Sequence, residues 1–266
     1  MRPDNWRGAL LIILVLALTA CATTGGGRHG PVTTSKEPLQ RIVIPPTPPE
    51  NDALQSLLAG QFALAAGDLP TASRQFAQAA RASNDPGLSA QATRTAIAAK
   101  QWDLARECVA RWQKLRADDP DLRPARASLA LHDGHPDAAF DDLNRLAVEP
   151  DGAGWGAIAQ TLLAAEDRDA AGALLERLVK PDLLGPKVQT WIAISQLASR
   201  LERPALAQSL ASAAAARFKS AEAYAWAAQL KLKSGDKAGA RTLFADALKK
   251  NPKDTHLRVA YAALLG

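Results

Sequence analysis

An alanine recurs at nearly equal intervals along most of this 266-residue chain. The recurring residues are Ala72, Ala105, Ala139, Ala171, Ala207 and Ala240, which are separated by 33, 34, 32, 36 and 33 residues. A fixed period of this length indicates a repeat architecture in which each repeat is one supersecondary unit. Because a small side chain lets two helix backbones approach closely, we expect each alanine where the two helices of a hairpin cross.

The residues around each alanine repeat as well. A turn precedes every alanine, at Gly67-Asp68, Lys100-Gln101, Gly134-His135, Glu166-Asp167, Glu202-Arg203 and Gly235-Asp236. Four residues after each alanine comes an apolar partner, namely Phe76, Val109, Leu143, Leu175, Ala211 and Phe244. Prolines near the hairpin boundaries end one helix before the next begins, at Pro86, Pro120, Pro150, Pro181 and Pro252. These features predict a series of helical hairpins.

The stretch from Tyr224 to Pro252 carries the pattern in full, with a turn at Gly235-Asp236, the pair Ala240 and Phe244, and a terminal proline. It resembles one tetratricopeptide repeat, and the resemblance extends over Asn51 to Pro252. Trp155, Trp191 and Tyr224 all stand at the aromatic position of that repeat, 16 residues before their alanines. The resemblance implies an all-α fold, a right-handed α-solenoid of six hairpins plus a terminal helix.

The fifth hairpin departs furthest from the consensus. It has no Gly-Asp turn, Ala211 replaces the phenylalanine, and Pro204 is expected inside the turn. After Pro252, Asp254 is the expected N-cap of a terminal helix that is apolar nearly all round. A capping helix should be polar on its outer face, so we expect either a longer relative or a partner that covers this end.

The N-terminal residues have the layout of a secretory signal peptide. Arg2 and Arg7 precede a ten-residue apolar run, which is too short to span a bilayer. The run ends in Leu18-Thr19-Ala20-Cys21, which resembles the lipobox of bacterial lipoproteins. The resemblance implies a signal peptide at 1–20, acylation of Cys21 and, with Ala22 next instead of aspartate, an outer-membrane anchor facing the periplasm. An ordinary signal peptide is the alternative.

Residues 21–50 are rich in glycine, threonine and proline and lack helical periodicity, which predicts a tether. Ile42-Val43-Ile44 could alternatively pack on the first repeat. Residues 51–266 form the expected repeat domain.

One position on the first helix of each hairpin, 11 residues before the alanine, is polar throughout. The row consists of Gln61, Arg94, Ser128, Gln160, Gln196 and Gln229. Glutamine both donates and accepts hydrogen bonds, so such a row could bind the backbone of an extended peptide, although the same position could simply face water. Four residues further along, Arg200 and Lys233 make the later repeats basic, and we include them in the predicted partner-binding groove.

Charge is unevenly distributed. Residues 217–266 contain ten Lys and Arg against four Asp and Glu, a net of +6, whereas residues 51–216 come to about −3. The basic end could take an acidic partner, a C-terminal carboxylate or a lipid headgroup, or it could be an ordinary solvated surface.

The sequence offers no support for an enzyme, a cofactor or a metal site. The segment from His132 to His135 falls on an interhelix turn, and the sequence has no cluster of Cys, His or carboxylate residues elsewhere that could complete a metal site. Cys108 has no nearby histidine. No phosphate-binding loop or catalytic motif appears, and a basic and aromatic platform for nucleic acid is lacking. We expect Cys108 to be a small buried residue.

These observations predict a periplasmic lipoprotein that binds proteins or peptides in its groove and the membrane through its acyl chains. It resembles adaptors for a C-terminal-processing protease, and accessory lipoproteins of outer-membrane protein assembly are the alternative. For a component of polysaccharide export, aromatic side chains should line the groove, which makes the exposure of Trp102 and Trp112 informative.

Overall fold

The structure is a computed structural model that describes residues 52–265. The predicted signal peptide, Cys21, the tether and Ile42–Ile44 lie outside the described residues. Thirteen α-helices run through the described part: α2 (Ala53–Ala65), α3 (Leu69–Arg81), α4 (Pro86–Ala98), α5 (Trp102–Leu115), α6 (Leu122–His132), α7 (Pro136–Ala147), α8 (Trp155–Ala164), α9 (Arg168–Leu178), α10 (Val188–Arg200), α11 (Pro204–Phe218), α12 (Ala221–Lys233), α13 (Lys237–Lys250) and α14 (Thr255–Leu265).

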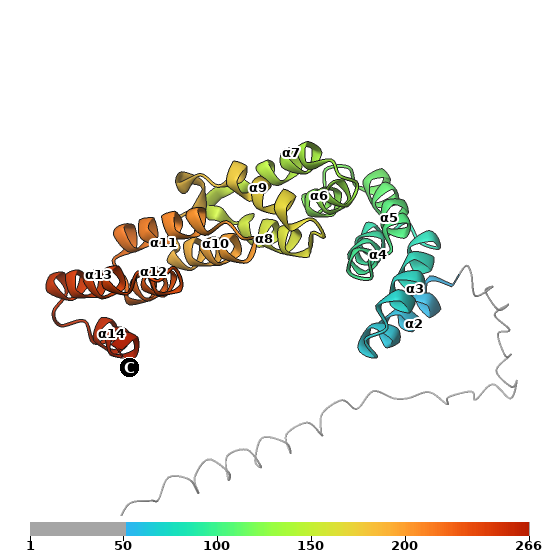
Figure 1. Ribbon diagram of the computed structural model, residues 1–266. Helices are drawn as coiled ribbons and strands as arrows, with labels where there is room; N and C mark the ends of the chain where they lie inside the picture. The colour runs from blue at the N-terminus through green and yellow to red at the C-terminus, as the bar shows by residue number, and fades with distance from the viewer. Residues whose placement is uncertain (1–51, 266) are drawn as a thin grey trace, which may run out of the picture. The chain divides into compact units, whose positions relative to one another are not determined.

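The helices form six hairpins in sequence order, from α2–α3 to α12–α13, and α14 packs on the last hairpin (Figure 1). The first helices of successive hairpins also pack on one another, from α4 through α6, α8, α10 and α12 to α14. The predicted all-α fold of six hairpins plus a terminal helix is therefore confirmed. The handedness of the solenoid stays a prediction.

The recurring alanine occupies one structural position throughout. It is the fourth residue of the second helix in every hairpin, and each of the six alanines is at most 1% exposed. The apolar partner four residues later is buried in every hairpin as well. Trp155, Trp191 and Tyr224 are buried on the first helices of the last three hairpins. The period therefore marks the close contact between helices that the small side chain predicts.

Local signals explain where several helices begin. Asp68, Asp167 and Asp236 each accept a hydrogen bond from a backbone N–H in the first turn of the following helix. Such caps satisfy amide groups that have no partner inside the helix. Pro204 lies at the first position of α11 and not inside the turn, because its fixed φ suits that position and the missing N–H is not needed there.

Five of the six turns inside the hairpins contain a left-handed residue, and the turn of the fourth hairpin does not. Gly67, Gly134 and Gly235 adopt φ values of 78°, 73° and 86°, and Lys100 and Glu202 adopt 56° and 59° at the equivalent positions. The fifth hairpin thus keeps the turn geometry without the glycine. The left-handed conformation costs a residue with a Cβ atom roughly 1–2 kcal/mol.

Two 3₁₀ segments, η2 (Pro150–Gly152) and η3 (Pro181–Leu184), lie in the links before and after the fourth hairpin and contact each other. The indole of Trp155 donates to the Leu183 carbonyl at 2.9 Å, and that of Trp191 donates to the Gly185 carbonyl at 3.1 Å. Leu184 is fully buried between them. η3 falls within the longest interval of the alanine pattern and accounts for its 36 residues.

A candidate binding trough on the first helices

Three neighbouring cavities lie across the first four hairpins. Their volumes are about 780, 340 and 390 Å³. The first and second share Lys100, Trp102 and His132 as lining residues. The second and third share Arg94, Ile97, Ser128, Thr161 and Ala164. Neighbouring cavities therefore lie side by side. The second and third share five lining residues on the first helices, and we call these two together the trough.

The trough gathers part of the predicted polar row. Arg94 on α4, Ser128 on α6 and Gln160 on α8 all line the third cavity. Arg94 and Gln160 are exposed, whereas Ser128 is half-buried and its hydroxyl donates to the Pro124 carbonyl at 2.9 Å. Three residues that the sequence spaces one repeat apart therefore lie around a single hollow.

The other members of the predicted groove lie elsewhere. Gln61, Gln196 and Gln229 are exposed on α2, α10 and α12, and Arg200 is exposed at the end of α10. Lys233 lines a separate cavity of about 380 Å³, where its ammonium group donates to the Ser199 hydroxyl at 3.3 Å. A partner-binding role for these five residues stays a prediction.

Thr161 is a trough residue that was not predicted from the sequence. It is only 5% exposed and lines both cavities of the trough. Its hydroxyl makes no hydrogen bond to any residue between 52 and 265. The hydroxyl oxygen stays accessible from the cavities, so it is a donor and acceptor available to a ligand.

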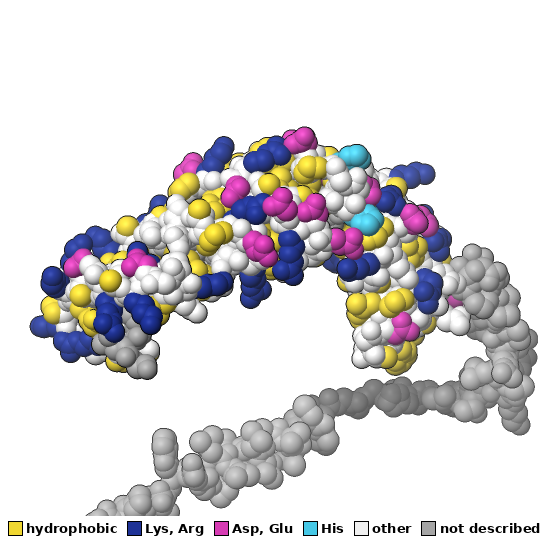
Figure 2. Space-filling model, viewed as in Figure 1, with side chains coloured by type: hydrophobic (Ala, Val, Ile, Leu, Met, Phe, Trp, Pro, Cys, Tyr) yellow, Lys and Arg dark blue, Asp and Glu magenta, His cyan; other side chains and the backbone are white. Residues whose placement is uncertain are grey.

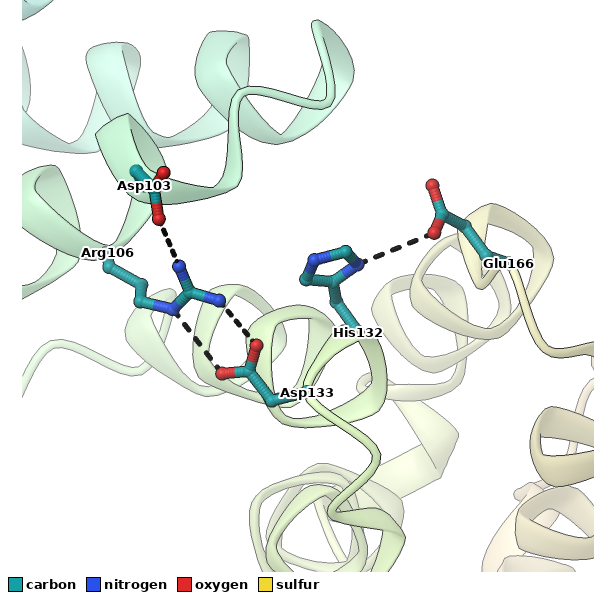
Figure 3. Close-up of polar contacts among 5 residues, drawn as sticks. All are labelled: Asp103, Arg106, His132, Asp133 and Glu166. Atoms are coloured by element: carbon teal, nitrogen blue, oxygen red, sulfur yellow. Dashed lines mark hydrogen bonds and ion pairs between the residues drawn. The ribbon is translucent and has the colours of Figure 1, made fainter.

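Arg106, which lines the first cavity, connects the second hairpin to the third (Figure 3). Its guanidinium bonds Asp103 at 2.6 Å and Asp133 at 2.5 Å. The hydrogen bond with Asp133 raises the pKa of Arg106 and lowers the pKa of Asp133. Both side chains are engaged in structure and are not available as free charges.

Lys100, His132 and Glu166 connect the turns of the second, third and fourth hairpins. His132 Nδ1 lies 3.4 Å from Glu166 Oε2 (Figure 3), and Lys100 Nζ lies 3.2 Å from Glu166 Oε1. The hydrogen bond with Lys100 is the main cause that lowers the pKa of Glu166. The imidazole of His132 also stacks on the indole of Trp102, with ring centroids 4.1 Å apart. The charges at this rim are balanced within the protein.

The aromatic side chains separate into core and rim. Trp112 is buried, and its indole donates to Asp119 Oδ2 at 3.0 Å, whereas Trp102 is half-buried and lines two cavities.

Cys108 is buried as predicted, and burial raises the pKa of its thiol to about 11. Between residues 52 and 265 no three His, Cys, Asp or Glu side chains gather as metal ligands.

Basic side chains gather at the C-terminal hairpin. Figure 2 shows Lys and Arg concentrated over α12, α13 and α14, whereas both signs mix over the middle helices. Lys231 pairs with Asp236 at 2.9 Å, but Lys237 and Arg241 have no carboxylate partner among residues 52–265. Within that same part of the chain, no helix is long and apolar enough to cross a membrane.

No protein-family model matches the chain, and no curated protein matches it. Among solved structures, it is similar to PilW, a type IV pilus biogenesis factor, at 11% identity over 78% of this chain and 97% of that one, with a TM-score of 0.41. It is also similar to PilF from Pseudomonas aeruginosa, at 12% identity over 80% of this chain and 97% of that one, with a TM-score of 0.39.

A third solved structure, the Cut9–Hcn1 assembly, matches at 14% identity over 81% of this chain with a TM-score of 0.40. The chain spans only 43% of the length of that matched chain. The fold assignment follows from the helix packing described above.

Proposed function

We propose that this protein is a non-catalytic scaffold that holds a protein or peptide partner in the trough. The observation that carries the proposal is the trough across α4, α6 and α8, lined by exposed polar side chains from successive first helices. An extended peptide that crosses parallel helices meets a new side chain at every repeat. Stacked hairpins use such extended surfaces for recognition.

The polar groups of the trough suit binding better than catalysis. A nucleophilic site needs a base within hydrogen-bonding reach of its nucleophile, and His132 is instead held between Trp102 and Glu166. The hydroxyl of Ser128 points to a backbone carbonyl of its own helix. What remains free is one guanidinium, one hydroxyl, one amide and one carboxylate, which serve recognition in the absence of a base aligned with a nucleophile.

The cellular setting of the proposal depends on the N-terminal sequence. A lipobox-like Leu18–Cys21 followed by Ala22 supports acylation of Cys21 and an outer-membrane anchor on the periplasmic side. The tether at 21–50 would let the repeat domain reach partners beyond the membrane surface. Within this setting we favour an adaptor for a C-terminal-processing protease, and accessory work in outer-membrane protein assembly is the alternative.

A role in polysaccharide export has one observation in its favour, the half-buried Trp102 at the junction of two cavities. An indole face is a good platform for a sugar ring. However, one face of this indole is already stacked on His132, and Trp112 is in the core. We therefore rank a protein partner above a saccharide.

Photo-crosslinking in envelope membranes tests the scaffold. A photoreactive amino acid at Gln160 should capture a discrete set of proteins, and replacing Gln160, Gln196 and Gln229 together by alanine should reduce the capture. An unchanged set would place the interface elsewhere. Labelling with palmitate tests the anchor separately, since a Cys21→Ser variant that still incorporates the label would exclude acylation at that residue.

A further inference from the structure

We propose that the trough binds an internal segment of an extended peptide in which one acidic residue lies next to small aliphatic residues. The inference depends on the scaffold function and specifies its ligand. Arg94 binds the acidic side chain, Thr161 completes the polar contact, and an apolar floor takes the aliphatic neighbours.

Arg94 lines the trough with a guanidinium that has no partner among the described residues. Its guanidinium makes no ion pair or hydrogen bond with any residue in the range 52–265. The neighbouring cations differ, since Lys100 pairs with Glu166 and Arg106 pairs with two aspartates. A guanidinium presents a planar set of donors that matches both oxygens of a carboxylate. Charge complementarity at this point therefore selects an anion.

Thr161 supplies the second, independent observation. The residue is only 5% exposed, and it lines both cavities that Arg94 also lines. Its hydroxyl makes no hydrogen bond in the described range and stays accessible from the cavities. A ligand oxygen that reaches Arg94 would therefore have a donor beside it.

The floor of the third cavity consists of small and aliphatic side chains. They are Ile97, Pro124, Ala125, Ala157 and Ala164. Three alanines leave a hollow of about 390 Å³, which is enough for aliphatic side chains but offers no deep pocket for a large ring. The residues flanking the acid should thus be alanine, valine or leucine.

The shape of the trough favours an internal segment over a chain end. The second and third cavities share five lining residues and lie side by side across α4, α6 and α8, so an extended chain can lie along both. Asp121 lines the third cavity, and its carboxylate has no partner in the part of the chain that the structure describes. It repels a second negative charge, so a run of acidic residues is disfavoured.

Display selection tests this specificity. The probe is a library of random octapeptides flanked on both sides by Gly-Ser linkers, selected against the folded wild-type protein. Wild type should enrich one Asp or Glu next to Ala, Val or Leu. Arg94→Gln should remove the acidic preference and weaken a selected peptide about tenfold to a hundredfold, and Arg94→Glu should enrich Lys or Arg instead. Arg241→Glu is the matched control, because Arg241 is also exposed and unpaired among the described residues.

Thr161→Val provides a variant that keeps the fold. It should weaken the selected peptide about threefold to tenfold while the urea midpoint stays equal or rises, because the hydroxyl makes no hydrogen bond within residues 52–265 that the substitution would remove. A purely structural Thr161 would show the opposite, a lower midpoint and unchanged binding.

Other outcomes overturn the inference. The inference is wrong if Arg94→Glu selects the same peptides as wild type, or if wild type enriches no acidic residue. It is also wrong if the protein binds only peptides with a free C-terminal carboxylate. If the library gives no binders while crosslinking at Gln160 still captures proteins, the peptide specificity is wrong and the scaffold function remains. If crosslinking captures nothing either, the scaffold function is wrong as well.

Discussion

Gly60→Ala should destabilise the first hairpin even though alanine is the better helix former. Gly60 lies inside α2, where the exchange alone would stabilise the helix by about 1 kcal/mol. A Cβ atom at this position, however, would lie 2.7 Å from both Cδ1 and Cε1 of Phe76. The Phe76 ring is 1% exposed and packs in the core, so it cannot move aside cheaply. Overpacking of this kind costs typically 1–3 kcal/mol, and we expect a net loss of about 1 kcal/mol.

Gly156→Ala is the matched control. Gly156 lies in the first turn of α8, and nothing is within 4 Å of a Cβ atom built there. The same chemical change should therefore raise the free energy of unfolding, by up to about 1 kcal/mol. Urea unfolding followed by circular dichroism at 222 nm measures both variants, and amide exchange in α2 localises the loss to the first hairpin.

A double-mutant cycle isolates the contact. In a Phe76→Leu background the ring is removed, so Gly60→Ala should cost less than it does in wild type or become stabilising. If Gly60→Ala stabilises wild type as much as Gly156→Ala does, then Gly60 is not required for the close approach of α2 and α3. The assignment of a tight contact at this position would then be wrong.

Three further predictions concern the turns, the thiol and the acid response. Glu202→Gly should raise the free energy of unfolding by about 0.5–1 kcal/mol, because glycine relieves the left-handed strain at φ 59°; a lower urea midpoint would contradict this. In a Cys21→Ser variant, Cys108 should resist Ellman's reagent at pH 8 until urea is added, since a pKa of about 11 leaves roughly two hundredfold less thiolate than an ordinary thiol. Arg106→Gln should lower the urea midpoint at pH 6. This difference should shrink as the pH falls below about 4, because the lowered pKa of Asp133 stabilises the fold only while its carboxylate is ionised; a constant difference down to pH 2.5 would refute the coupling.

The hairpin plan could be predicted from the sequence because one physical requirement repeats. Every place where two helices cross needs a small residue, so the six alanines mark the same position in each second helix. Turn geometry was readable for the same reason at Gly67, Gly134 and Gly235. Lys100 and Glu202 could not be predicted as left-handed from residue type, because residues with a Cβ atom rarely adopt that conformation.

Other features lay outside any periodic signal. η3 is a single insertion, and its burial depends on two indoles that donate to the Leu183 and Gly185 carbonyls. Trp155 and Trp191 were placed correctly as aromatic positions of the repeat, but their hydrogen-bond partners come from irregular backbone. A recurring sequence pattern predicts the helices, whereas a contact that occurs at a single place in the chain is found only in the structure.

One residue of the trough can be compared with the residues at the same repeat position in the other hairpins. Ten residues before the recurring alanine, the third, fifth and sixth hairpins carry Leu129, Leu197 and Leu230, all buried. The second and fourth hairpins carry Thr95 and Thr161 at this position, both 5% exposed. The hydroxyl of Thr95 donates to the Gln91 carbonyl at 2.9 Å, whereas that of Thr161 makes no hydrogen bond within the described residues, which is the kind of exception expected at a binding site. Restoring the pattern with Thr161→Leu should therefore fill the trough, raise the urea midpoint if the larger side chain fits, and reduce peptide binding in either case.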